Sequence, residues 1–190
     1  MTSVYFIRHA VSPFSLGQEQ RRGLSPAGLE DARKIADRLA GEGIDQIFSS
    51  SYRRAVETVS FLAAALNKDI IELEALRERA VGSLDIEIDE QQLLEAVQKS
   101  FQDPDYCLPG GETIREAQDR AIPVIQELII DHEGKKIAIG THGNIMTAIL
   151  NYYNDSYGYE FWKSTTKPDI YKAEFESNKL VQLERLWEQR

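Results

Sequence analysis

Two histidines stand where an α/β protein would build an active site. His9 follows the apolar segment Val4–Ile7, and His142 follows the apolar segment Lys136–Gly140. The third histidine, His132, lies near a predicted helix C-terminus, where a positive charge is favourable, and is interpreted as structural. Either of the first two, taken alone, would be interpreted as a hydrogen-bonded core residue. Two of them in equivalent positions favour a site beyond the carboxyl ends of parallel strands.

Arginine is the second group that could do chemistry, and its positions indicate an anionic ligand. Arg8 adjoins His9, whereas Arg53 and Arg54 fall in the first turn of a predicted helix, just after a predicted strand. A planar guanidinium grips two oxygens of a phosphoryl group at once, and phosphoryl transfer depends mainly on positioning and positive charge. Arginines in a first helical turn usually face solvent, so one of this pair is expected on the surface.

A phosphate ester also needs an acid, because its leaving oxygen takes up a proton as the bond breaks. Glu78 is a candidate, since it follows the predicted strand Ile70–Leu73 and lies between two arginines. The chain has 31 acidic residues, however, and spacing alone favours a surface position for Glu78. No Cys/His cluster has the spacing of a zinc site, so the sequence predicts neither a metal nor a cofactor.

Hydrophobic periodicity predicts the elements that position these residues. Strands are predicted over 4–7, 44–49, 70–73, 136–140, 170–175 and 180–187, and helices over 26–39, 52–66, 86–101, 113–132 and 143–150. Strands that alternate with helices predict an α/β fold, a three-layer sandwich with a mostly parallel central sheet flanked by helices. Residues 1–190 have the length of a single domain.

Composition limits the partners that we expect. The net charge of −9 disfavours nucleic acid and anionic membranes, and no apolar run approaches the roughly 20 residues of a membrane span. The N-terminus lacks the pattern of a secretory signal, and Cys107 is the single cysteine, so a cytoplasmic location is expected. Arginines concentrated in the first 79 residues of an acidic chain suggest a small anionic ligand, although composition alone favours ordinary surface ion pairs.

Six short segments resemble, in family order, those of the histidine phosphatase (phosphoglycerate mutase-like) superfamily. They are Phe6–Ala10, Leu24–Gly28, Ser50–Thr58, Leu76–Glu78, Pro109–Thr113 and Thr141–Gly143. Each segment alone is weak evidence for the family, but the six segments in family order are strong evidence. The resemblance implies a metal-independent phosphatase for phosphate monoesters with a phosphohistidine intermediate on His9. Arg8, Arg54 (rather than Arg53) and His142 would hold the phosphoryl oxygens, and Glu78 would protonate the leaving group and then deprotonate water.

Further substrate contacts are expected from Ser15, Arg21 and Glu112, although the loop around the first two departs from the family pattern. Ala10 replaces the usual glycine, which we expect to be tolerated, and Ser15 replaces an asparagine. Arg21 or Arg22 is expected to reach the pocket from this loop, and Glu112 or Thr113 to support the site from behind. The short segment between Glu78 and Pro109 favours an open site and therefore hydrolysis.

The same residues leave two alternatives open. A phosphoglycerate mutase-type phosphotransferase would use an identical set and would return the phosphoryl group to a bound substrate. A non-catalytic binding module could keep the fold, but such a protein would be expected to lack His9, and His9 is present. In each case the expected partner is a small phosphorylated molecule.

Overall fold

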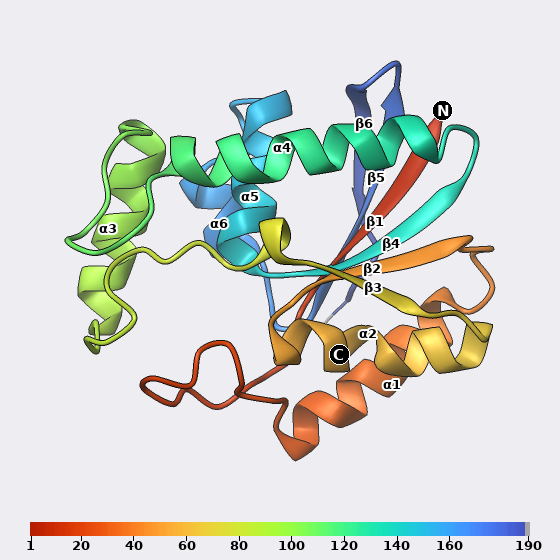
Figure 1. Cartoon of the computed structure of the whole chain (residues 1–190), viewed down its shortest axis with the longest axis horizontal. Coiled ribbons are helices and arrows are strands. Elements are labelled where there is room, and N and C mark those ends of the chain that lie inside the picture. The colour runs from red at the N-terminus through yellow and green to blue at the C-terminus, as the bar shows by residue number, and fades with distance from the viewer. Residues whose placement is uncertain (189–190) are drawn as a thin grey trace.

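The computed structural model describes residues 1–188, which form one six-stranded sheet with helices on both faces (Figure 1). The strands are β1 (Thr2–Arg8), β2 (Gln46–Ser50), β3 (Ile70–Leu73), β4 (Lys136–Thr141), β5 (Asp169–Glu176) and β6 (Lys179–Arg185). Their order in the sheet is β3-β2-β4-β1-β5-β6. The first four are parallel. β5 runs antiparallel to β1 and forms a hairpin with β6, and both residues of its turn, Ser177 and Asn178, have positive φ. The prediction of a mostly parallel sheet is confirmed.

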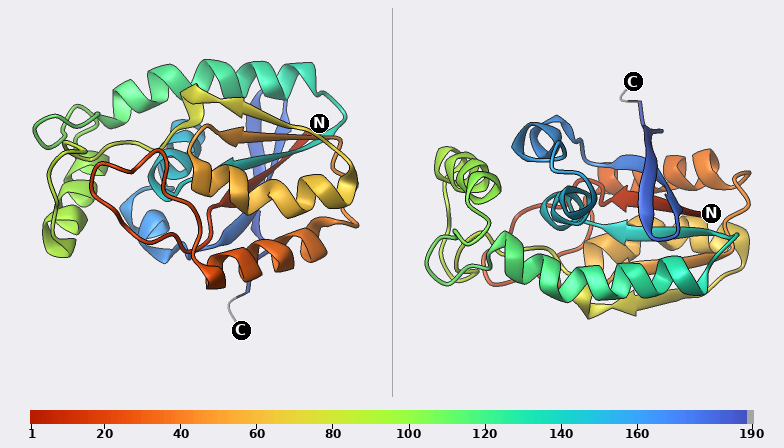
Figure 2. Two further views of the ribbon diagram at one scale, coloured as in Figure 1. Left: turned by 60° about the horizontal axis from the view of Figure 1, so that its bottom comes forward. Right: turned by 90° about the horizontal axis from the view of Figure 1, so that it is seen from above.

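Alternate residues of β1 point to two separate cores, which is why the fold has three layers. Tyr5 and Ile7 pack with the apolar faces of α1 (Pro26–Leu39) and α2 (Arg53–Leu66). Val4 and Phe6 pack on the opposite face, with α4 (Ile114–Asp131) and α5 (Gly143–Tyr153). The two views of Figure 2 show these helix pairs on opposite sides of the sheet. Period-two alternation of buried side chains therefore produces the predicted sandwich.

Helix ends follow the capping residues in the sequence. Ser25 caps α1 by accepting a hydrogen bond from the Gly28 N–H, with Pro26 at the first helical position, and the helix has the predicted bounds. Thr113 and Glu116 form a capping box at the start of α4. Asp89 caps α3 (Glu90–Gln102), so the helix predicted from Ile86 begins four residues later and residues 86–88 belong to a loop. The predicted start of this helix was wrong because it relied on the apolar residue Ile86 and did not use Asp89 as the N-cap.

Two short elements have no counterpart in the prediction. These are the single turn η1 (Glu74–Leu76) and α6 (Tyr159–Ser164), both too short for helical periodicity to be recognised. Aromatic residues in and around α6 pack against two of the hydrophobic clusters. Tyr157 and Phe161 pack against the main core, and Trp162 packs against a third cluster with α3.

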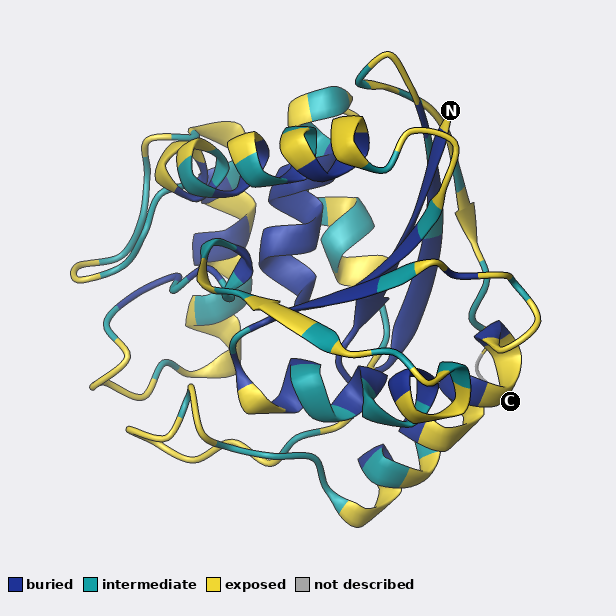
Figure 3. Cartoon of the chain, turned by 45° about the vertical axis from the view of Figure 1, so that its right-hand side comes forward, coloured by how far each residue is buried: buried dark blue, intermediate teal, exposed yellow. Residues whose placement is uncertain are grey.

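The parallel topology brings three strand ends to one edge of the sheet. Arg8, at the end of β1, is in register with Thr141 at the end of β4, and β2 ends beside them at Ser50. Behind this edge lies the first part of α5, in which every residue from Gly143 to Leu150 is buried (Figure 3). Within residues 1–188, no helix combines the length and apolarity needed to cross a bilayer.

Candidate active site

His9 and His142 meet at the edge of the sheet. The His9 N–H donates to the Thr141 carbonyl at 2.9 Å, which continues the β1–β4 ladder by one residue. The two imidazole ring centres are 5.2 Å apart, and the rings lie at 63° to each other. His9 is 4% exposed and His142 is fully buried. The pairing of adjacent parallel strands thus places two residues 133 positions apart side by side.

The backbone fixes the tautomer of His9. Its Nδ1 lies 2.7 Å from the Ala10 carbonyl oxygen, which can only accept, so Nδ1 carries the hydrogen. In the neutral ring, Nε2 then has the free lone pair of a nucleophile. Burial, with help from the positive charge of Arg54, holds the pKa of His9 well below its usual value. The ring is therefore neutral near pH 7.

His142 presents a hydrogen-bond donor to the same region. Ser50 Oγ accepts from the Tyr52 N–H at 3.2 Å and lies 2.7 Å from His142 Nε2. The Ser50 hydroxyl hydrogen has no other acceptor within residues 1–188, so the hydroxyl donates to Nε2 and the ring hydrogen of His142 lies on Nδ1. Burial and the charge of Arg54 also hold the pKa of His142 well below its usual value.

Arg8 and Arg54 are both held by hydrogen bonds from their terminal nitrogens, and the Nε of each has no partner. Arg8 Nη1 donates to the carbonyl and hydroxyl oxygens of Thr165. Arg54 is 1% exposed; its Nη1 donates to the Glu19 carbonyl at 2.6 Å, and its Nη2 lies 2.7 Å from the Glu19 carboxylate. Burial lowers the pKa of Arg54 to about 10, so the guanidinium stays charged at neutral pH.

Unsatisfied donors concentrate in this group of residues. Within residues 1–188, five buried side-chain polar atoms have no hydrogen-bond partner. Three of them are Arg8 Nε, Arg54 Nε and His142 Nδ1. Buried polar groups are normally paired, and an unpaired donor costs about 1–3 kcal/mol. Three unpaired donors around one neutral histidine fit a site made for an anion.

The small residues of the motifs have steric roles. A Cβ at Gly143 would lie 2.7 to 2.9 Å from the guanidinium atoms of Arg8, so the glycine makes room for that arginine. Ala10 is completely buried, its φ is not positive, and its N–H donates to Thr58 Oγ1 at 3.0 Å. Thr58 also donates to the Arg54 carbonyl at 2.7 Å and so links the His9 loop to α2.

A cavity of about 500 Å³ opens over these residues. Of the predicted site residues, Arg8, His9, Ser15, Arg54 and Glu78 line it, whereas His142, which is fully buried, does not. Arg53 instead pairs with Glu57 at the surface, where its side chain is 64% exposed. The neighbouring arginines differ because consecutive positions on a helix face different directions.

Two predicted substrate contacts, Arg21 and Glu112, lie elsewhere, and one cation of the cavity, Lys167, was not predicted. Arg21 is exposed and does not line the cavity; Arg22 does, held by the Glu19 carboxylate at 2.9 Å and the Ser12 carbonyl at 3.1 Å. Lys167 also lines the cavity, and desolvation together with Arg8 and Arg22 lowers the pKa of its ammonium group. Lys167 precedes β5 and belongs to no motif, so nothing in the sequence distinguished it as a site residue.

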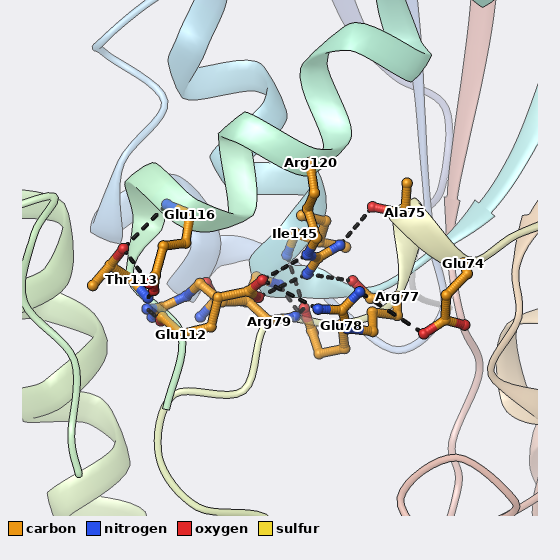
Figure 4. Close-up of polar contacts among 11 residues, drawn as sticks. Glu74, Ala75, Arg77, Glu78, Arg79, Glu112, Thr113, Glu116, Arg120 and Ile145 are labelled. Carbon is orange, nitrogen blue, oxygen red and sulfur yellow. Dashed lines mark hydrogen bonds and ion pairs between the residues drawn. The ribbon is translucent and has the colours of Figure 1, made fainter. Parts of the chain in front are cut away.

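Glu78 is clamped by backbone amides rather than lying free on the surface (Figure 4). Its Oε1 accepts from the Arg79 and Ile145 N–H groups, both at 2.8 Å, and its Oε2 accepts from the Asn144 N–H at 3.1 Å. Asn144 and Ile145 open α5, so the carboxylate sits at the positive end of that helix. The surface position favoured by spacing alone was wrong.

Glu112 does not line the cavity and acts behind Glu78. Its carboxylate receives two hydrogen bonds from Arg120, at 2.6 and 2.8 Å, and Arg120 also donates to the Ala75 and Arg77 carbonyls. Arg79 links the same region, because its Nη1 donates to the Glu112 carbonyl and its Nε to the Asn144 side chain. Glu112 therefore holds the segment that carries Glu78, and it makes no direct contribution to the cavity wall (Figure 4).

Among residues 1–188, no three His, Cys, Asp or Glu side chains come together in a way that could hold a metal ion.

Comparison with known proteins gives the family. The sequence matches the histidine phosphatase superfamily (branch 1) over residues 4–185, and the chain belongs to it. It is 29% identical to the phosphoglycerate mutase-like protein 4 of Arabidopsis thaliana over 133 residues, which are 66% of this chain and 58% of that relative. The chain thus spans less than two thirds of that relative's length. It is also 29% identical to the metal-independent phosphoserine phosphatase of A. thaliana, over 78% of this chain and 67% of that relative.

A solved structure supports the fold independently. The mycobacterial glucosyl-3-phosphoglycerate phosphatase superimposes with a TM-score of 0.77 at 20% identity, covering 96% of this chain and 97% of that one. At this identity the likeness establishes the architecture alone.

Proposed function

We propose that the chain is a phosphatase that hydrolyses small phosphate monoesters through a phosphohistidine on His9, without a metal ion. The observation that carries this proposal is the set of three buried, unpaired nitrogens of Arg8, Arg54 and His142 around a neutral His9. Three donors satisfy a phosphoryl group and stay fixed as its charge redistributes in the transition state. The names of relatives that are phosphatases agree with this class of activity.

The first step forms a covalent bond from His9 to phosphorus. Nε2 attacks in line while Nδ1 keeps its hydrogen bond to the Ala10 carbonyl, which orients the ring and stabilises the positive charge it acquires. The bond from phosphorus to the leaving oxygen breaks, and Glu78 supplies that oxygen with a proton. Because Glu78 and His9 both line the cavity, the two groups can act on opposite sides of one phosphorus atom.

The second step releases phosphate. Glu78 now takes a proton from water, and the resulting hydroxide attacks phosphorus and frees Nε2. Arg8, Arg54 and His142 hold the same oxygens in both steps, so the two transition states share one set of donors. Lys167 and Arg22 add positive charge at the cavity wall.

The test is hydrolysis of a panel of phosphate esters by the purified protein in excess chelator. We expect turnover to persist in chelator and to vanish in His9→Ala. Rapid acid-free quenching of the wild type with ³²P-labelled substrate should give an alkali-stable, acid-labile phosphoprotein. Activity that requires an added metal, or that survives His9→Ala, would overturn the proposal.

The same purified protein can be used to distinguish hydrolysis from transfer of the phosphoryl group back to a bound substrate. A phosphotransferase would convert 3-phosphoglycerate to 2-phosphoglycerate faster than it releases phosphate, and a bisphosphate primer would stimulate it. We expect phosphate release to dominate with and without the primer.

A further inference from the structure

The cavity over His9 extends well beyond the group that would hold phosphate. Its outer wall comes from two loops, residues 12–19 and 80–88, and from Leu93 of α3 and Trp162 of α6. Three large apolar side chains of these loops face water: Phe14 is 60% exposed, Leu84 46% and Ile86 66%. Figures 1 and 2 show both loops at the same end of the sheet. Exposed apolar side chains gathered around a cavity mark a binding surface.

Charge is distributed unequally along the cavity. Four cations line the part of the cavity around His9, namely Arg8, Arg22, Arg54 and Lys167. Arg22 and Arg54 both pair with Glu19, which also lines the cavity, whereas Arg8 and Lys167 form no ion pair within residues 1–188. Residues 80–93 contain no lysine or arginine, and they contribute Glu87 and Glu90 to the wall. The remaining cation in the lining, Arg79, is 2% exposed, and its guanidinium nitrogens are all bonded to Asn144, Glu112 and Ser100.

We infer that the outer part of the cavity is a subsite for an apolar, uncharged leaving group, so that the preferred substrates are alkyl or aryl phosphate monoesters. This inference rests on the proposed function, because the phosphate end determines how the ester is oriented. A second anionic group on the substrate would meet Glu87 and Glu90 with no free cation from residues 80–93 to offset them. Phosphoglycerates and bisphosphates are therefore disfavoured on electrostatic grounds.

The size of the cavity agrees with this class of substrate. A volume of about 500 Å³ lies within the range of sites that enclose a drug-sized molecule. Ile86 and Phe14 line this cavity and are exposed to water. A chain that covers them removes apolar surface from water, and this gain grows with each methylene.

The experiment compares straight-chain alkyl phosphates from ethyl to hexyl, whose leaving alcohols have nearly equal acidity. We expect kcat/KM to rise by up to about fourfold per methylene, or about two-hundredfold over the series, if each methylene is fully buried. Phe14→Ser and Ile86→Ser should flatten the dependence on chain length. Val181→Ser is the matched control, because Val181 is 53% exposed on β6 and does not line the cavity. It should leave the series unchanged.

A double variant tests whether the acidic residues of the outer wall disfavour a second anionic group. Glu87→Lys combined with Glu90→Lys should raise kcat/KM for 3-phosphoglycerate relative to hexyl phosphate. A wild-type protein that prefers 3-phosphoglycerate to hexyl phosphate, or shows no dependence on chain length, would overturn the inference.

Calorimetric binding of alkylphosphonates, which cannot be hydrolysed at phosphorus, separates the two proposals. Tighter binding of hexylphosphonate than of ethylphosphonate, lost in Ile86→Ser, supports the subsite even if no ester is turned over, in which case only the proposed function fails. Turnover with equal binding of both phosphonates would remove the subsite and leave the phosphatase. Concentration-dependent dimerisation abolished by Phe14→Ser, again with equal phosphonate binding, would show instead that the apolar side chains form an interface between copies.

Discussion

Replacement of Arg54 by alanine should be far more damaging than the same replacement of Arg53. Arg54 is 1% exposed, contributes a free Nε beside His9 and lines the cavity. Arg53 lies one position away on the same helix, and its exposed side chain contacts Glu57. The two variants therefore remove the same side chain from the same turn, and only one of them removes charge from the site.

The expected magnitudes follow from these contacts. Loss of one donor aimed at a transition-state oxyanion costs on the order of 10²–10³ in rate, and we expect this loss in kcat/KM for Arg54→Ala. The change also removes a charged hydrogen bond to Glu19, worth roughly 1.5–3 kcal/mol. At about 2–4 °C per kcal/mol for a domain of this size, Tm should fall by about 3–12 °C. The exposed Arg53–Glu57 pair contributes at most about 1 kcal/mol.

The assay is steady-state hydrolysis of p-nitrophenyl phosphate at a temperature well below either Tm, with folding checked by circular dichroism. Arg53→Ala should keep most of its kcat/KM. Arg54→Lys is an informative third variant, because it restores charge without the planar fork and should recover only part of the loss. Equal losses in the two alanine variants, or a larger loss in Arg53→Ala, would refute the assignment of phosphate binding to Arg54.

Three further outcomes follow from the site. Glu78→Gln should lose much more kcat/KM on an alkyl phosphate than on p-nitrophenyl phosphate, whose leaving group needs no proton; equal losses would exclude Glu78 as the acid. Gly143→Ala should displace the Arg8 guanidinium and lower kcat/KM by up to about 10² while the fold persists, and wild-type kinetics would contradict the steric argument. The pKa values of His9 and His142 are lowered, so below pH 6.5 the unfolded chain binds protons that the folded chain does not. The free energy of unfolding should be highest above that pH and fall on acidification by up to about 1.4 kcal/mol per pH unit per histidine. The urea midpoint of the His142→Gln variant should therefore fall less steeply with decreasing pH than that of the wild type.

The strands that form the floor of the site could be predicted because their signal is local. Val4–Ile7 and Lys136–Gly140 are short apolar runs, each ended by a histidine, and both are strands of the parallel sheet. Parallel strands in an α/β fold share the edge at their carboxyl ends. A shared location of His9 and His142 at this end of the sheet was therefore predictable, although the adjacency of β1 and β4 and the hydrogen-bond partners of the two rings were not.

Features that depend on contacts between distant segments were not predictable. Glu78 has nothing in its neighbourhood that distinguishes it from other acids, because its partners are amides 66 and 67 positions away. Lys167 reaches the cavity from a loop without a motif. Glu112 lies behind the site because Arg120 of α4 binds its carboxylate and also donates to the carbonyls of Ala75 and Arg77.

The clamp around Glu78 also makes the protein a convenient subject for NMR. Three amide protons, those of Arg79, Asn144 and Ile145, donate to one carboxylate. A change in the charge of that carboxylate should move all three resonances together. Asn144 and Ile145 are buried at the start of α5, so their amides should also exchange slowly with solvent and remain observable at alkaline pH. The protonation of a single group during turnover can thus be followed from the backbone, with no label on the substrate.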